Sequence, residues 1–112
     1  MQDLVDITEI ERRIAASENV LVRCTAAWNS RLDNELERWL AEISIDGAPI
    51  QTLRLDVDDS RAWEALLSWR VLNIPALVFF RGGNRVETII GTRPAPELEL
   101  LFRRWFSGED AT

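Results

Sequence analysis

Apolar residues follow a helical period at the start of the chain and a strand pattern directly after it. Three isoleucines carry the helical period: Ile7, Ile10 and Ile14. Thr8 with Glu11 has the form of a capping box, so we expect a helix at about residues 8–17. The run NVLVRCT, residues 19–25, is almost continuously apolar, which is typical of a central strand covered on both faces. Residues 4–5 predict a short edge strand before the helix.

The middle of the chain repeats this alternation of helix and strand. Five apolar residues fall on one face of a second predicted helix: Leu32, Leu36, Trp39, Leu40 and Ile43. Ser30 with Asp33 has the form of a second capping box, and the turn sequence DGAP, residues 46–49, ends the helix. Residues 50–57, IQTLRLDV, predict a strand, and residues 60–69 predict a third helix capped by the serine at its start.

The last third of the chain predicts a β-hairpin and a closing helix. The runs PALVFFR and RVETIIG flank the turn GGN, whose glycines permit the backbone angles of a tight turn. Pro94 and Pro96 lie around the first turn of the final helix, and Gly108 ends it. The predicted buried face of this helix holds Leu98, Leu101, Phe102 and Trp105. The order of elements, βα units followed by a hairpin and a helix, indicates an α/β fold with a mixed sheet.

Length and charge limit the classes of partner. A chain of 112 residues is one domain, and we assign residues 1–112 to it, with a core at about residues 4–106 and a short acidic tail at residues 107–112. The net charge of −6 argues against binding to nucleic acid or to an anionic membrane. The N-terminal residues lack the apolar stretch of a secretory signal, so we expect a cytoplasmic protein.

Two missing residue types and a single cysteine exclude many kinds of catalytic site. All 13 basic residues are arginine, the chain has no histidine, and Cys24 is its one cysteine. No imidazole is available for a nucleophile pair or as a metal ligand, and no lysine for a Schiff base or a phosphate-binding loop. A single cysteine cannot form an internal disulfide or a CxxC redox pair. We therefore expect no metal and no cofactor.

Two segments resemble the thioredoxin family. The run VLVRCTAAWNSRL, residues 20–32, is similar to that family's strand leading into W-C-G-P-C, with Trp28 in the place of the tryptophan. The run VLNIPALVFFRGGNRVETIIG, residues 71–91, is similar to its isoleucine–cis-proline strand and terminal hairpin, including Gly83 and Gly91. The resemblance implies a thioredoxin fold, with a central mixed sheet of four to five strands and helices on both faces. It also implies a cis peptide bond between Ile74 and Pro75.

The family's redox residues do not carry over to this chain. Asn29 and Leu32 occupy the positions of the two cysteines, and Ser30 and Arg31 replace the Gly-Pro between them. The family's buried aspartate, which assists proton transfer, corresponds to Arg23. Because thiol–disulfide exchange needs a thiolate and a resolving thiol, we expect a redox-inactive protein that is not an enzyme.

Cys24 and Arg23 lie in the predicted central strand, where alternation points them to opposite faces. We interpret Cys24 as a small buried apolar residue rather than a reactive thiol. A buried guanidinium needs a carboxylate or a route to water. Asp56 on the neighbouring strand is the first candidate partner of Arg23, an acidic residue of a covering helix is the second, and a side chain that reaches water at the end of the sheet is the alternative.

The resemblance suggests that the family's peptide groove remains in use. We expect a protein-binding module, such as an adaptor, chaperone or assembly factor, that binds a protein or an extended peptide segment by strand addition. The expected surface contains Trp28, Arg31, Ile74, Pro75, Ala76 and Gly91. The tryptophans on helical stripes are instead predicted to be core: Trp39, Trp63, Trp69 and Trp105.

The alternative function is an enzyme with non-CxxC chemistry, or with a glutathione-type mixed disulfide at Cys24. The C-terminal part of the chain also resembles thioredoxin-like accessory proteins encoded with hydrogenases, which implies a signal-peptide-bearing precursor as one class of partner.

Overall fold

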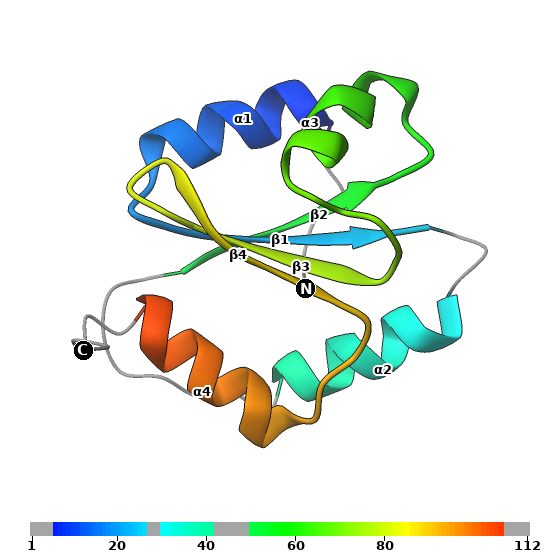
Figure 1. Ribbon diagram of the computed structural model, residues 1–112, viewed down its shortest axis with the longest axis vertical. Coiled ribbons are helices and arrows are strands. Elements are labelled where there is room, and N and C mark those ends of the chain that lie inside the picture. Colours follow the sequence, from blue (N-terminus) through cyan, green and yellow to red (C-terminus); the bar gives the residue numbers. More distant parts are fainter. Residues whose placement is uncertain (1–5, 27–29, 42–49, 107–112) are drawn as a thin grey trace.

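A computed structural model describes residues 6–26, 30–41 and 50–106 of the chain (Figure 1). The helices are α1 (Ile7–Ala16), α2 (Ser30–Ala41), α3 (Trp63–Ser68) and α4 (Ala95–Phe106), with the short 3-10 helix η2 (Ser60–Ala62) directly before α3. The strands are β1 (Asn19–Thr25), β2 (Gln51–Asp56), β3 (Ala76–Arg81) and β4 (Asn84–Ile90). The predicted elements are therefore present in the predicted order across the described part of the chain.

The four strands form one mixed sheet in the order β2-β1-β3-β4. Strand β1 is central, because it pairs in parallel with β2 and antiparallel with β3. Helices α1 and α3 cover one face of the sheet, and α2 and α4 cover the other (Figure 1). Because both faces of β1 are covered, its seven residues are all buried, as the apolar run 19–25 predicts.

The sheet separates two apolar cores. The core under α1 and α3 contains Ile7, Ile10, Ile14, Val20, Val22, Cys24, Leu53, Leu55, Ala62, Trp69, Ala76, Val78 and Phe80. The core under α2 and α4 contains Leu21, Leu36, Leu77, Phe79, Leu98, Phe102 and Phe106. Phe79 and Phe106 stack with ring centroids 5.4 Å apart, so Phe106, which the sequence analysis did not include, belongs to the buried face of α4 in place of the half-buried Leu101 and Trp105.

Two helix starts differ from the predicted ones. Asp6, not Thr8, caps α1, because its Oδ1 accepts the Glu9 N–H at 2.9 Å. Asp59, not Ser60, caps η2, because its Oδ1 accepts the Arg61 N–H at 3.0 Å. In both cases an aspartate just before the predicted cap reaches the first free amides of the helix.

The turn of the hairpin consists of Gly82 and Gly83, whose φ angles are 59° and 85°. Positive φ at both central residues is typical of the two-residue turns that match the twist of antiparallel strands. Asn84, which was predicted in the turn, begins β4. Several predictions lie outside the described residues: the edge strand at residues 4–5, the turn at residues 46–49 and the acidic tail. In the segments that the structure describes, no helix is long and apolar enough to span a lipid bilayer.

Candidate functional site

The site begins where β3 starts, at the Ile74–Pro75 peptide bond. This bond is cis, the isomer implied by the resemblance to the thioredoxin family. Pro75 is buried, and its carbonyl accepts the Gly91 N–H at 2.8 Å, which joins the start of β3 to the residue just after β4. Gly91 has a φ of 86°, a backbone conformation that side-chain-bearing residues rarely adopt. Two of the residues assigned to the binding surface are therefore in direct contact.

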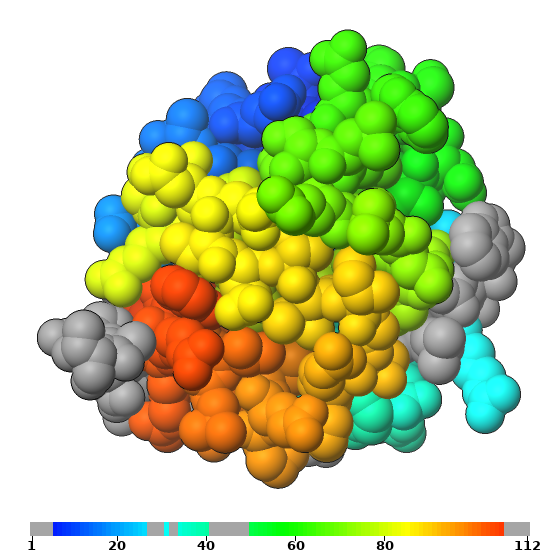
Figure 2. All heavy atoms as spheres, in the orientation of Figure 1, coloured from blue at the N-terminus to red at the C-terminus, as the bar shows by residue number. Residues whose placement is uncertain are grey.

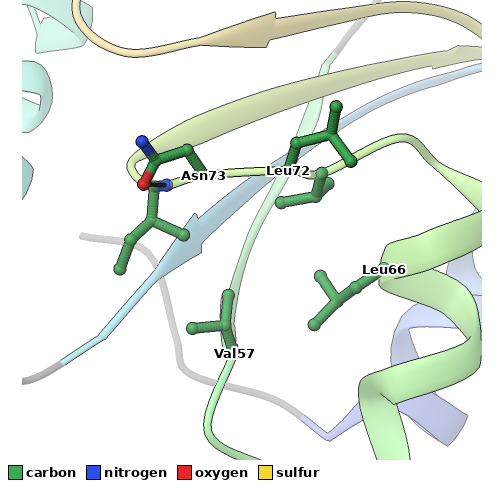
Figure 3. Close-up of a pocket in the computed structure, with 6 residues that line it drawn as sticks. Val57, Leu66, Leu72 and Asn73 are labelled. Atoms are coloured by element: carbon green, nitrogen blue, oxygen red, sulfur yellow. Dashed lines mark hydrogen bonds between the residues drawn. The ribbon is translucent and has the colours of Figure 1, made fainter.

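An apolar hollow of about 210 Å³ lies immediately before Pro75 (Figure 3). Its lining comes from the residue after β2, from α3 and from the segment that leads into β3: Val57, Leu66, Val71, Leu72, Asn73 and Ile74. Leu66 points from α3 toward Val57 in Figure 3. Leu72 is 82% exposed at the rim of the hollow, and Ile74 is half-buried. No local sequence pattern predicts this hollow, since its walls come from three separate segments.

The segment that contains this wall, residues 70–74, is bonded at its two ends to β4 and to the residue just after β4. Before this wall, the Thr88 hydroxyl donates to the Trp69 carbonyl at 2.6 Å. After it, Pro75 accepts the Gly91 N–H. The wall continues the end of α3, because the Val71 N–H donates to the Leu66 carbonyl at 2.9 Å.

The other predicted site residues have different positions. Ala76 is fully buried and pairs with both Cys24 and Ile90, so it lies inside the sheet rather than on the binding surface. The Ile74 N–H donates to the Asn73 Oδ1 at 2.8 Å, so a peptide strand that used this N–H would have to displace that bond. Arg31 is exposed in the first turn of α2.

Four motif residues are described in part or not at all. Trp28 and Asn29 lie outside the described residues. The backbone of Ser30 and Leu32 lies in the first turn of α2.

Arg23 forms an ion pair across the sheet–helix interface. Its side chain is 1% exposed, and its Nη1 donates to the Glu37 Oε2 at 3.1 Å. The partner is thus the acidic residue of a covering helix and not Asp56, whose Oδ1 instead accepts the Asp58 N–H after β2. The side chain also does not reach water at the end of the sheet. Arg54 lies beside Arg23 in the register of β1 and β2, so the two arginines are neighbours across these strands.

Cys24 is fully buried on the opposite face of the sheet, as its position in the strand predicts. Burial raises the pKa of the Cys24 thiol to about 12. The thiol is therefore protonated at neutral pH and shielded from solvent in this structure, a poor starting point for a nucleophile. Among the residues that the structure describes, no group of three His, Cys, Asp or Glu side chains is arranged to hold a metal ion.

Solved structures with similar architecture define the class of fold. A mutant thioredoxin from Halobacterium salinarum matches with a TM-score of 0.69 at 22% identity, covering 92% of this chain and 90% of that one. The protein Trxlp from Edwardsiella tarda matches with a TM-score of 0.68 at 20% identity, covering 88% and 97%. The chain has the thioredoxin fold.

Sequence relatives identify the family. A thioredoxin from Alicyclobacillus acidocaldarius is 30% identical over 91 residues, which is 80% of this chain and 83% of the relative. The chain belongs to the thioredoxin family. A thioredoxin from Listeria monocytogenes is 36% identical over 59 residues, so the match spans only 55% of that relative's length. No protein-family model matches the chain.

These relatives overturn one expectation from the sequence. The absence of the CxxC pair predicted a protein without thiol–disulfide oxidoreductase activity, that is, not an enzyme. The relatives are named thioredoxin, which is the name of a thiol–disulfide oxidoreductase. The prediction rested on the two cysteine positions and on Arg23 in place of the family's buried aspartate, whereas the similarity to enzymes extends over most of the chain.

Proposed function

We propose that this member of the thioredoxin family binds an extended segment of a partner protein in the cytoplasm, at the surface formed by the apolar hollow, Pro75 and Gly91. The hollow is the observation that carries the proposal. Small-molecule sites commonly have volumes of about 300–1,000 Å³. A hollow of about 210 Å³ is better matched to one apolar side chain of a peptide than to a cofactor.

The exposure of Leu72 supports the same function. A leucine that is 82% exposed contributes little burial free energy to the free protein. A partner side chain in the hollow would remove part of this leucine from water. Contacts of this kind do not require a free N–H at Ile74, so the hydrogen bond from Ile74 to Asn73 does not oppose them. The proposal therefore depends on side-chain burial more than on strand addition.

A pair of fluorescein-labelled peptides tests the proposal by fluorescence anisotropy. The peptides are nine residues long and identical except for a central leucine or serine, and we expect the leucine peptide to bind more tightly. Leu72→Ser should weaken binding of the leucine peptide about fivefold to tenfold, since part of a leucine contact of about 1.5–3 kcal/mol is lost. Leu100→Ser is the matched control, because Leu100 is also exposed (69%) but lies on α4. Equal affinities for the two peptides, or equal effects of the two variants, would contradict the proposal.

Thiol–disulfide exchange is the second candidate function, because the relatives are named thioredoxin. In this chain the reaction would use Cys24, whose thiolate would attack a disulfide, form a mixed disulfide with one sulfur and release the other as a thiol. Glutathione disulfide is one such substrate. Insulin reduction with dithiothreitol, measured for the parent protein and for Cys24→Ala, tests this function directly. Turnover above the buffer rate that disappears in the variant would support it, and identical rates for both proteins and buffer would exclude it.

A further inference from the structure

Arg93, two residues after Gly91, is held in a fixed orientation beside the proposed binding surface. Its Nη1 donates to the Ile90 carbonyl at 3.0 Å and to the Thr92 carbonyl at 2.9 Å. The side chain is half-buried. These two bonds anchor one end of the guanidinium to the backbone at the end of β4.

The other edge of the same guanidinium, formed by Nε and Nη2, remains available. Within residues 6–26, 30–41 and 50–106, neither atom makes a hydrogen bond, and Arg93 forms no ion pair. In the described segments, neither atom is among the buried polar atoms that lack a partner. Two parallel N–H groups in a rigid plane match the two oxygens of a carboxylate.

The position of Arg93 connects this edge to the binding surface. A Cβ atom built on Gly91 would lie 3.6 Å from the Arg93 Nη1, so the guanidinium lies against Gly91. Gly91 in turn donates to the Pro75 carbonyl, and Ile74, the residue before Pro75, lines the hollow. The residues that follow β4 and the segment that follows α3 lie side by side on the molecular surface (Figures 1 and 2). The apolar hollow and the guanidinium are therefore at two ends of one continuous row of contacts.

We propose that Arg93 determines the specificity of this surface by binding a carboxylate of the partner segment. The inference rests on the proposed function and narrows its partner class to an extended segment with an apolar side chain for the hollow and an acidic side chain close to it. The net charge of −6 repels acidic peptides from the protein as a whole. A preference for an acidic peptide would thus have to come from a local cation such as Arg93.

The test extends the leucine peptide described above to a set in which one residue near the leucine is Glu, Gln or Arg. That residue is placed one, two, three or four positions from the leucine, on either side, because the direction and register of the bound segment are to be found. At the best position we expect the Glu peptide to bind about fivefold to tenfold more tightly than the Gln peptide. Arg93→Gln should remove this difference, so that the Glu and Gln peptides bind with equal affinity. Arg93→Lys should retain part of it, since the charge remains and the planar pair of donors is lost. Arg104→Gln, at an exposed arginine of α4, is the matched control and should have no effect.

The comparison between peptides separates this inference from the proposed function. A change in folding stability of Arg93→Gln would alter binding of the Glu and Gln peptides equally, so the ratio of their affinities reports only on recognition. If the leucine peptides bind but the parent protein does not prefer Glu, or prefers Arg, the assignment of Arg93 is overturned and the proposed function stands. If Glu is preferred and Arg93→Gln keeps the preference, another cation such as Arg31 provides it, and the assignment is likewise overturned. If no leucine peptide binds more tightly than its serine counterpart, the proposed function fails and the assignment fails with it.

Discussion

Raising the pH from 8.5 to 11.5 should destabilise this protein through a single side chain, Cys24. The chain has no lysine, histidine or tyrosine, so no other side chain titrates in this range. The Cys24 thiol is fully buried between the strands and the helices α1 and α3, and burial raises its pKa to about 12. In the unfolded chain the same thiol has a pKa of about 8.5–9.

The difference between the two pKa values fixes the sign and size of the effect. Above pH 9 the unfolded chain loses the thiol proton and the folded protein keeps it, so the free energy of unfolding falls as the pH rises. The maximum slope is about 1.4 kcal/mol per pH unit. A raised pKa of about 12 gives a total loss of about 4 kcal/mol by pH 12, with full stability retained below about pH 8.5. Such a loss is a large part of the 5–15 kcal/mol that is usual for a single domain.

Urea unfolding followed by tryptophan fluorescence measures this slope at intervals of half a pH unit. The matched control is Cys24→Ala, which lacks the titrating group. Its free energy of unfolding will be lower by a constant amount of about 1 kcal/mol because of the smaller side chain, but it should be nearly independent of pH. A parent protein whose stability is equally flat, or a variant with the same slope as the parent, would refute the burial of an uncharged thiol as the cause.

Three further predictions concern other residues. Glu37→Gln should lower the free energy of unfolding by about 2–3 kcal/mol, because it weakens the pairing of a buried guanidinium. Arg23→Met should change the free energy of unfolding by less than about 1 kcal/mol, since the remaining carboxylate is 44% exposed and can be hydrated. Equal losses for the two variants in urea unfolding would contradict this asymmetry. Trp28→Ala and Arg31→Glu should each weaken peptide binding without a change in melting temperature, and parent-like affinity of both variants would remove these residues from the binding surface. Trp63→Ala should change the melting temperature by no more than about 2–4 °C, because the indole is 66% exposed, and a larger drop would show that it packs in the fold.

The sequence predicted the sheet and its helices well because their apolar periods are strong. The apolar run at residues 19–25 predicted a central strand, and two glycines predicted the hairpin turn. Trp63 was predicted to be core from its spacing on a helical stripe, and that prediction is wrong. Ala65 and Leu66 of α3 pack against the core, whereas Trp63 and Leu67 are exposed, so the side of α3 that faces the sheet is not centred on Trp63. Spacing alone does not reveal which side of a short helix is covered.

The candidate site was predicted less completely, because contacts between distant segments determine it. The resemblance located Pro75 and Gly91, which are in hydrogen-bond contact. The hollow depends on how three segments meet, and no local pattern records that. The orientation of Arg93 is set by local bonds to the Ile90 and Thr92 carbonyls, which require the folded end of β4. The one local signal for Arg93 was its position, because it is a charged residue in the short segment between Gly91 and Pro94. For Arg23, the residue type predicted an ion pair, but the choice between Asp56 and Glu37 required the packed helix.

The attachment of residues 70–74 to β4 has a consequence for the kinetics of binding. The bonds from Thr88 to Trp69 and from Gly91 to Pro75 fix both ends of this segment in the free protein. A partner therefore meets a wall that is already in place, and little conformational entropy is lost by the protein on binding. Association of different peptides should then proceed at similar rates, set by diffusion and orientation. Differences in affinity between good and poor partners should appear mainly as differences in how long each one stays bound.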